Sequence, residues 1–341
     1  MKTIYTCILA FIFLCAGCAY NDSVTAGDEN VYAVVMKATG NPYNELTAEG
    51  FRKEIEKAGA TCIVEYPEST SAESQIRLIQ ELVRREVDAI AIAANDMNAL
   101  EASLQEALAA GIKVSTLDSN TNEKSRMIFV NQISAREAGE SLVEAVYDIS
   151  EGAGQWAILS ATSQASNQNQ WIDEMKRILE DEKYKDLMLV DIVYGDDEEE
   201  ASAKKTRLLM ESYPDLKVIC VPTIVGLQTA AKVIRDEFPQ STTKVTGFGL
   251  PSHMEPYIGD DDQSICPYMY LWDPRDVGRL SAYVSMALVE GSIKGNKDET
   301  FVAGNMGTFI VTDCPDGGTE VIVGKPLRFD KNNIEQWRDI F

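Results

Sequence analysis

The chain has 341 residues, of which 45% are apolar and 25% are charged, a composition typical of soluble globular proteins. At roughly 150 residues per domain, this length predicts about two domains. The 54 acidic and 31 basic residues give a net charge of −23, which argues against nucleic acid as a partner because phosphate carries the same sign. The chain has one histidine, His253, so a multi-histidine metal site is not expected and a Ser-His-Asp hydrolase would have to be built around that residue.

Residues 1–17 are expected to be a lipoprotein signal peptide. Lys2 precedes an apolar stretch that ends in the sequence LCAGC. A positive start, about ten apolar residues and small residues before a cleavage site describe a secretory signal, and the stretch is too short to span a bilayer. Its ending resembles the lipobox of bacterial lipoproteins, in which Cys18 becomes the lipidated first residue. An ordinary signal peptide with an incidental cysteine is the alternative.

Residues 18–29 are small and polar, which predicts a tether between a lipid anchor and the fold. No later stretch of the sequence is apolar enough to span a membrane. We therefore expect a protein of the cell envelope that lies at the outer face of the cytoplasmic membrane or in the periplasm.

From residue 31 onward, apolar strand-like runs alternate with segments of helical period. The predicted strands are Val31–Met36, Thr61–Tyr66, Ala89–Ala93, Lys113–Leu117, Met127–Val130, Gln155–Leu159, Leu187–Tyr194, Lys217–Val221, Lys244–Phe248 and Ile265–Trp272. Helices between them include Leu46–Ala58, Ser74–Arg85, Ala99–Ala110 and Ala135–Ile149, with Gly59 and Gly111 as expected left-handed C-caps. This alternation predicts an α/β fold of two similar lobes, each with a parallel sheet covered by helices on both faces.

The cysteines do not have the spacing of a metal site. Cys62 and Cys220 lie in apolar strand-like runs and are interpreted as buried thiols. Cys266 and Cys314 stand in less apolar surroundings, each followed by proline. An export compartment permits a disulfide between them, but the sequence leaves the connectivity open.

Two acidic runs, at 196–200 and 260–262, lack the alternation, glycine and glutamate of an EF-hand calcium loop. We interpret both as solvated loop or helix-start surface. Neither a GxxxxGK[ST] loop nor a GxGxxG after the first strand occurs, so no nucleotide or dinucleotide cofactor is expected. In open α/β sheets, ligands instead bind at the carboxyl ends of the strands.

Polar and aromatic residues follow two strands of the predicted first lobe. Lys37, Asn41 and Tyr43 come after the first strand and offer a charged donor, an amide and a flat ring. Asp118 follows the fourth strand, where its carboxylate can accept from two neighbouring hydroxyls of a polyol. The alternatives are an exposed lysine, a plain Asn-Pro turn and a capping aspartate.

The predicted second lobe carries amides at the corresponding place. The segment after its first strand includes Asn167 and Gln168 and ends in a tryptophan. Because amides both donate and accept, such a cluster suits a neutral hydroxylated ligand. Later strand ends carry Pro222, Ile224 and Trp272, of which the tryptophan has ordinary core packing as its alternative. An activated nucleophile, a base and a metal site are missing, so the pattern predicts binding and not catalysis.

These residues resemble the type I periplasmic sugar-binding proteins of ABC importers over essentially the whole mature chain. The segments SNQNQWIDEM, YPDLKVICVPTIVG, GFGLPSHMEPYI and LWDPRDVGRLSAYV are most similar to the rhamnose-binding subgroup, with the autoinducer-2-binding proteins a close second. The resemblance implies two Rossmann-like lobes that close over the ligand about a three-segment hinge. It also implies a monomer whose partners are a small-molecule sugar and the subunits of an ABC permease.

The implied boundaries follow from where the chain crosses between lobes. We place the crossings near Asn131–Ser134, at Trp272–Pro274 and within about Val302–Thr312, with a helix Arg275–Glu290 that returns to the first lobe. This assigns residues 30–131 and 274–301 to lobe 1, and residues 132–273 and 302–341 to lobe 2.

Residue by residue, the resemblance implies a set of ligand contacts. Lys37 and Tyr43 match a lysine and an aromatic wall after the first strand, and Asp118 matches the aspartate that holds sugar hydroxyls. Gln168 matches a glutamine contact, whereas Asn167 stands where autoinducer-2 receptors have an aspartate. Pro222 and Ile224 match positions that give backbone and wall contacts. Trp272 takes the place of a polar glutamine in the ribose-binding branch.

The asparagine at position 167 favours a particular sugar. An aspartate only accepts, while an asparagine also donates, and a buried polar group left unpaired costs about 1–3 kcal/mol. We therefore expect a deoxyhexose such as rhamnose, whose methyl group packs on Tyr43 or Trp272. A signalling receptor, for autoinducer-2 or another sugar, is the alternative function. A transcription factor needs a DNA-binding segment where the signal peptide stands, and an enzyme needs a base that only His253 or a perturbed carboxylate offers.

Overall fold

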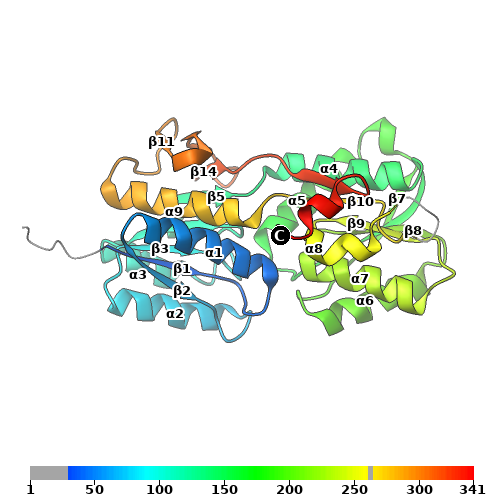
Figure 1. The fold of residues 1–341 in the computed structure, drawn as a ribbon, viewed down its shortest axis with the longest axis horizontal. Helices are drawn as coiled ribbons and strands as arrows, with labels where there is room; N and C mark the ends of the chain where they lie inside the picture. Colours follow the sequence, from blue (N-terminus) through cyan, green and yellow to red (C-terminus); the bar gives the residue numbers. More distant parts are fainter. Residues whose placement is uncertain (1–29, 260–263) are drawn as a thin grey trace, which may run out of the picture.

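Two α/β lobes lie end to end in the computed structural model, which describes residues 30–259 and 264–341 (Figure 1). Each lobe is built on a sheet of parallel strands with helices against it, which is the predicted fold class. Cys18, with the expected signal peptide and tether, lies outside the described residues, and so does the acidic run at 260–262.

The first lobe contains a seven-stranded sheet with the order β13-β14-β5-β4-β3-β1-β2. Neighbouring strands pair in parallel except β13 and β14. The Val, Ile and Ala side chains on both faces of the central strands are buried, as the apolar runs predicted. The strands are β1 (Val31–Val35), β2 (Thr61–Glu65), β3 (Ala89–Ile92), β4 (Lys113–Leu117), β5 (Ile128–Asn131), β13 (Thr312–Asp313) and β14 (Thr319–Ile322).

Helices cover both faces of this sheet. The pair α1 (Pro42–Lys57) and α9 (Pro274–Glu290) lies on one face, and α2 (Ala72–Arg84) with α3 (Glu101–Ala109) lies on the other (Figure 1). Helices α1 and α9 approach so closely that a Cβ atom on Gly278 would lie 1.9 Å from the carbonyl oxygen of Thr47. The return helix is therefore fixed against the first lobe by backbone packing that only glycine permits at this position.

The second lobe contains a four-stranded parallel sheet with the order β7-β6-β8-β9, and a bridge between Phe248 and Tyr270 joins it to the antiparallel pair β10–β15. Helices α4 and α5 pack together, as do α6 and α7. The strands are β6 (Gly154–Ser160), β7 (Leu187–Tyr194), β8 (Leu216–Val221), β9 (Lys244–Gly247), β10 (Tyr268–Leu271) and β15 (Leu327–Asp330). The helices are α4 (Ala135–Ile149), α5 (Ser166–Ile178), α6 (Glu199–Ser212), α7 (Ile224–Glu237), α8 (Pro251–Met254) and α10 (Ile334–Trp337).

The chain passes between the two sheets three times: between β5 and α4, between β10 and α9, and between β14 and β15. The third passage differs from the expected one at about Val302–Thr312. Strand β14 pairs in parallel with β5 of the first sheet, and β15 pairs with β10 of the second. Residues up to Ile322 therefore belong with the first lobe, because their strand completes its sheet.

The remaining elements are short. Strands β11 (Thr300–Val302) and β12 (Thr308–Ile310) form a hairpin, and four 3-10 turns lie at Glu123–Ser125, Glu182–Tyr184, Glu255–Tyr257 and Gly304–Met306. Gly59 and Gly111 adopt the positive φ angles, 79° and 92°, expected of them. Across residues 30–259 and 264–341, no helix has both the length and the apolar character needed to cross a bilayer.

All four cysteines in the described part of the chain are free thiols. Cys220, Cys266 and Cys314 are buried, and Cys62 is half-buried. Cys314 lies in the turn between β13 and β14 beside Asn120, whereas Cys266 precedes β10 in the second lobe. The disulfide that the sequence left open between Cys266 and Cys314 is therefore not formed in this structure.

Candidate functional site

A cavity with about 440 Å³ of empty space, the open solvent at its mouth included, lies between the lobes. Its walls come mainly from segments that follow strand ends. All nine side chains singled out in the sequence line it: Lys37, Asn41, Tyr43, Asp118, Asn167, Gln168, Pro222, Ile224 and Trp272. Six more residues complete the wall: Asn44, Trp171, Asp197, Thr223, Phe248 and Leu271.

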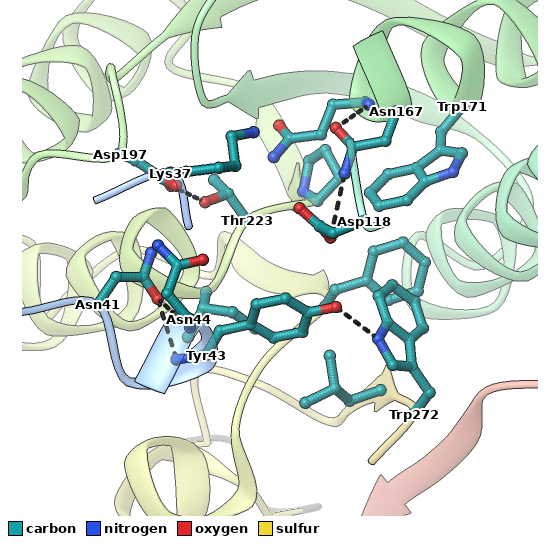
Figure 2. A pocket seen from close by; sticks show the side chains of 15 residues that line it. Lys37, Asn41, Tyr43, Asn44, Asp118, Asn167, Trp171, Asp197, Thr223 and Trp272 are labelled. Carbon is teal, nitrogen blue, oxygen red and sulfur yellow. Dashed lines mark hydrogen bonds between the residues drawn. The ribbon is translucent and has the colours of Figure 1, made fainter. Parts of the chain in front are cut away.

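The first lobe contributes a charged pair to the cavity (Figure 2). Asp118 is buried after β4, and its Oδ1 accepts from Gln132 Nε2 at 3.2 Å. Burial raises the pKa of Asp118 above its ordinary value of 3.8, and the positive charge of Lys37 opposes that rise. Lys37 Nζ donates to Ser119 Oγ at 2.9 Å. The lysine thus lowers the cost of keeping a carboxylate in a buried site.

Asn41 caps the start of helix α1 and also lines the cavity. Its Oδ1 accepts from the backbone N–H groups of Tyr43 and Asn44, at 3.0 and 3.4 Å, and Pro42 follows as the first helical residue. This N-cap makes α1 begin four residues before the predicted start at Leu46. The cap aims the first turn of α1, with its tyrosine ring, into the cavity (Figure 2).

The amides come from the first turn of α5 in the second lobe. Asn167 Oδ1 accepts from Ser119 Oγ at 3.1 Å, and its Nδ2 donates to Asp118 Oδ1 at 3.5 Å, so this side chain bonds across the two lobes. Gln168 Oε1 accepts from Ser160 Oγ at 2.6 Å and from the N–H of Ala161 at 2.9 Å. No hydrogen bond from Gln168 Nε2 is found among the described residues, which leaves this donor for a ligand in the cavity.

Asp197 corrects one interpretation of the sequence. It lies in the acidic run that we expected to be solvated surface, and its neighbours Asp196 and Glu198 are indeed exposed. Asp197 itself is half-buried in the cavity wall, where its Oδ1 accepts from Thr223 Oγ1. Asp196 and Asp197 both have a left-handed backbone, with φ of 55° and 56°, so the chain turns at this point.

Four aromatic rings gather on one side of the cavity (Figure 2). Trp272 lies between the others, with ring centroids 5.0 Å from Phe248, 6.0 Å from Trp171 and 6.3 Å from Tyr43. Trp272 Nε1 donates to Tyr43 Oη at 2.8 Å, so the polar atoms of both rings are paired and their carbon surfaces remain for contact. Pro222 and Ile224, at the end of β8 and the start of α7, add further apolar wall.

The arrangement can bind hydroxyls, but it has no assembled catalytic group. His253 lies in α8 and is absent from the cavity wall, and burial lowers its pKa. Burial also raises the pKa of Tyr43 well above 10.0, so the phenol stays neutral. No group of three or more His, Cys, Asp or Glu residues in the described ranges is placed to hold a metal ion.

Comparison with known proteins matches residues 32–293 to the family described as periplasmic binding protein domain. An ABC transporter solute binding protein from Clostridium phytofermentans, crystallised with bound L-rhamnose, is similar at 46% identity with a TM-score of 0.90; the match covers 92% of this chain and 99% of that one. LsrB from Clostridium saccharobutylicum in complex with AI-2 shares the fold, at 22% identity and a TM-score of 0.83 over 90% and 99% of the two chains.

A curated relative, the D-ribose/D-allose-binding protein of Pseudomonas aeruginosa, is 25% identical over 240 residues, which are 67% of this chain and 73% of the relative. The family match spans well over half of the chain, and its members are extracytoplasmic solute receptors and not enzymes. The chain belongs to the periplasmic binding protein family, as a sugar-binding solute receptor of the ABC-transporter type.

Proposed function

We propose that this receptor binds L-rhamnose and delivers it to its permease. The observation that carries the proposal is the division of the cavity into two sides (Figure 2). One side presents Lys37, Asp118, Asn167 and Gln168, which both donate to and accept from hydroxyls. The other presents the carbon faces of an aromatic group that we call the aromatic wall: Tyr43, Trp171, Phe248 and Trp272.

A 6-deoxyhexose has the same division. Its ring hydroxyls need a polar surface, and its methyl group has no hydrogen-bonding capacity and gains from apolar contact. Burying one methyl group contributes about 0.8 kcal/mol, or roughly fourfold in affinity. The related receptor with bound L-rhamnose, at 46% identity over nearly the whole chain, supports the same assignment.

The contacts proposed for the bound sugar follow from the geometry of the cavity. Asp118, a buried carboxylate, accepts hydrogen bonds from two hydroxyls, while Gln168 Nε2 donates to a third oxygen. Lys37 and Asn167 bracket the same hydroxyls from opposite lobes. Pro222 and Ile224 lie against the sugar ring, and Asn41 lies at the edge of the site.

The test is calorimetric titration of the purified protein with L-rhamnose, D-ribose, D-galactose and autoinducer-2. We expect L-rhamnose to bind tightly and the other three to bind at least tenfold more weakly. If autoinducer-2 binds best, the receptor serves signal uptake and the proposed sugar is wrong. If none of the four binds, the assignment of rhamnose is also overturned.

We further propose that the receptor acts as a monomer held at the membrane by a lipid on Cys18. The support is the sequence LCAGC at residues 14–18 and the polar residues that follow it. Mass spectrometry of the protein from membranes tests the anchor. The expected result is an acylated N-terminal Cys18, and release of a Cys18→Ser variant into the soluble fraction. An unmodified mature terminus contradicts the proposal.

A further inference from the structure

A second contact between the lobes lies beside the sugar cavity without lining it. Ser166, the first residue of α5, is buried against Asn120, which follows β4. The Ser166 hydroxyl accepts from the backbone N–H of Asn120 at 3.0 Å and donates to its carbonyl oxygen at 3.1 Å. One side chain of the second lobe therefore makes two hydrogen bonds to a single residue of the first.

The side chain of Asn120 holds the accepting backbone in place. Its Oδ1 accepts from Thr116 Oγ1 at 2.8 Å and from the N–H of Thr121 at 3.0 Å. Its Nδ2 donates to Asp316 Oδ2 at 3.1 Å. All three partners belong to the first lobe, so these bonds do not depend on how the lobes meet.

Asp316 is fixed in turn by a buried arginine. Arg126, with a side chain only 1% exposed, donates from Nη2 to both carboxylate oxygens of Asp316, at 3.0 and 2.8 Å. Its Nη1 donates to the carbonyl oxygen of Thr121 at 2.9 Å. Asp316 lies in the turn between β13 and β14, the segment that the late third passage keeps in the first lobe. This ion pair between a buried arginine and a half-buried aspartate anchors the loop that carries Asn120.

The Ser166 hydroxyl has no other function in its helix. The N-cap of α5 is Ala165, which has no side chain able to cap, and Ser166 makes its hydrogen bonds across the lobes instead. When the lobes separate, the two hydrogen bonds are exchanged for water. They therefore stabilise the closed arrangement by the net free energy of two hydrogen bonds, and this free energy is the same whichever sugar is present.

We propose that Ser166 is a positioning residue for sugar binding: it stabilises the closed lobes through Asn120, which Arg126 and Asp316 hold ready. The residues of the cavity decide which sugar binds, and this contact adds to the affinity for any sugar that the closed lobes enclose. The proposal rests on the proposed function only for the choice of L-rhamnose as the probe.

The experiment compares Ser166→Ala with the parent protein by calorimetry and stopped-flow fluorescence. Loss of two hydrogen bonds is expected to weaken L-rhamnose binding about tenfold, mainly through faster release. The ratio of the affinities for L-rhamnose and L-lyxose, which lacks the C6 methyl group, stays the same because the hydroxyl does not touch the ligand. Ser166→Thr retains a hydroxyl and restores binding.

Ser163→Ala is the matched control, since Ser163 is an exposed serine of the same segment, and its affinity should equal that of the parent. Asp316→Asn weakens the support of Asn120, and its effect should not add to that of Ser166→Ala because both act on one contact. Affinities for Ser166→Ala that equal those of the control overturn the proposal, and so does a changed ratio of L-rhamnose to L-lyxose.

Small-angle scattering of the ligand-free proteins separates this proposal from the identity of the sugar. Ser166→Ala is expected to have a larger radius of gyration than the Ser163→Ala control, because its open lobes are more populated. If L-rhamnose does not bind the parent, the proposed function fails and the scattering alone decides. Equal radii, together with equal affinities of Ser166→Ala and Ser163→Ala for any sugar of the panel that binds, then overturn the role of Ser166.

Discussion

The two lobes contribute different chemistry to the same cavity. The first lobe supplies Lys37 and Asp118, whose polar atoms already bond to Ser119 and Gln132 on the same side of the cleft or at its hinge. The second lobe supplies neutral amides and most of the aromatic wall, and its Asn167 makes its contacts to Asp118 and Ser119 across the cleft.

Because of this difference, the first lobe mainly determines the affinity, and the second lobe mainly determines which ligand binds. Hydrogen bonds to an ionised carboxylate are stronger than those between neutral groups, so the first lobe provides much of the affinity for hydroxyls. Amides and rings discriminate by direction and shape, since a wrongly placed donor or a polar atom against a ring is left unpaired. Asp197 is the one carboxylate that the second lobe adds to the cavity wall.

Removal of the buried charge from the first lobe should have the largest effect. Asp118→Asn retains the size of the side chain, and asparagine tolerates the left-handed φ of 59° at this position. Because two charge-assisted hydrogen bonds weaken, we expect L-rhamnose affinity to fall about 100-fold by calorimetry. Asp173→Asn, on the exposed face of α5, is the control. A loss of less than threefold removes Asp118 from the binding contacts.

Introduction of a charge into the second lobe should be the next most severe change. In Asn167→Asp, a second carboxylate replaces the amide that lies 3.5 Å from Asp118 Oδ1. The like charges repel and one of them takes up a proton. We expect affinity for L-rhamnose to fall about 30-fold at pH 7 and to recover in part as the pH is lowered. An affinity equal to that of the parent contradicts the role given to the amide.

The parent protein should respond to pH in the opposite direction. Burial raises the pKa of Asp118, so its carboxylate gains a proton at a pH above the ordinary 3.8. Sugar hydroxyls donate to the ionised form, and affinity is therefore expected to fall as the pH drops through this raised pKa, by about tenfold per unit below it. Calorimetry at several pH values measures the effect, and Asp118→Asn should lack it.

The same raised pKa has the reverse sign for folding. The charged form of Asp118 is less favourable in the folded than in the unfolded chain, so stability decreases as the pH rises through the raised pKa. Asp118→Asn should therefore melt at a higher temperature than the parent at pH 7 in the absence of sugar. A lower melting temperature would show that the carboxylate stabilises the empty cavity.

Loss of the hydroxyl from Tyr43 should have the smallest effect. In Tyr43→Phe the ring remains in the aromatic wall, but Trp272 Nε1 loses the acceptor it reaches at 2.8 Å and Asp118 loses a neighbouring hydroxyl. One neutral hydrogen bond corresponds to about 1 kcal/mol, and we expect roughly a fivefold loss of affinity with the preference among sugars unchanged. A change in that preference would place the tyrosine hydroxyl among the sugar contacts.

Much of this site could be predicted because parallel strands end at one edge of a sheet. Residues as distant in the chain as Lys37 and Trp272 line one cavity, since each follows or ends a strand of an alternating βα pattern. Phe248 ends such a segment too, so its position was a usable signal. Thr223 and Asn44 lie next to residues that the sequence did identify.

The other features of the fold and the site depend on interactions that leave no local pattern in the sequence. Asp197 belongs to an acidic run that is otherwise exposed, and the turn at Asp196 and Asp197 and the hydrogen bond with Thr223 place it at the cavity. The predicted position of the third passage was wrong for a similar reason: β14 is four residues long and pairs with β5, about 190 residues earlier in the chain. Short, distant pairings leave no periodicity in the sequence.

One pair of titrations decides whether the cavity selects a hydroxylated ring with an apolar end. L-mannose differs from L-rhamnose only by a hydroxyl on C6, which would lie unpaired against Trp272 and Phe248. We predict that the purified protein binds L-rhamnose about 5- to 150-fold more tightly than L-mannose. Equal or tighter binding of L-mannose would contradict the assignment of the aromatic wall to the methyl group.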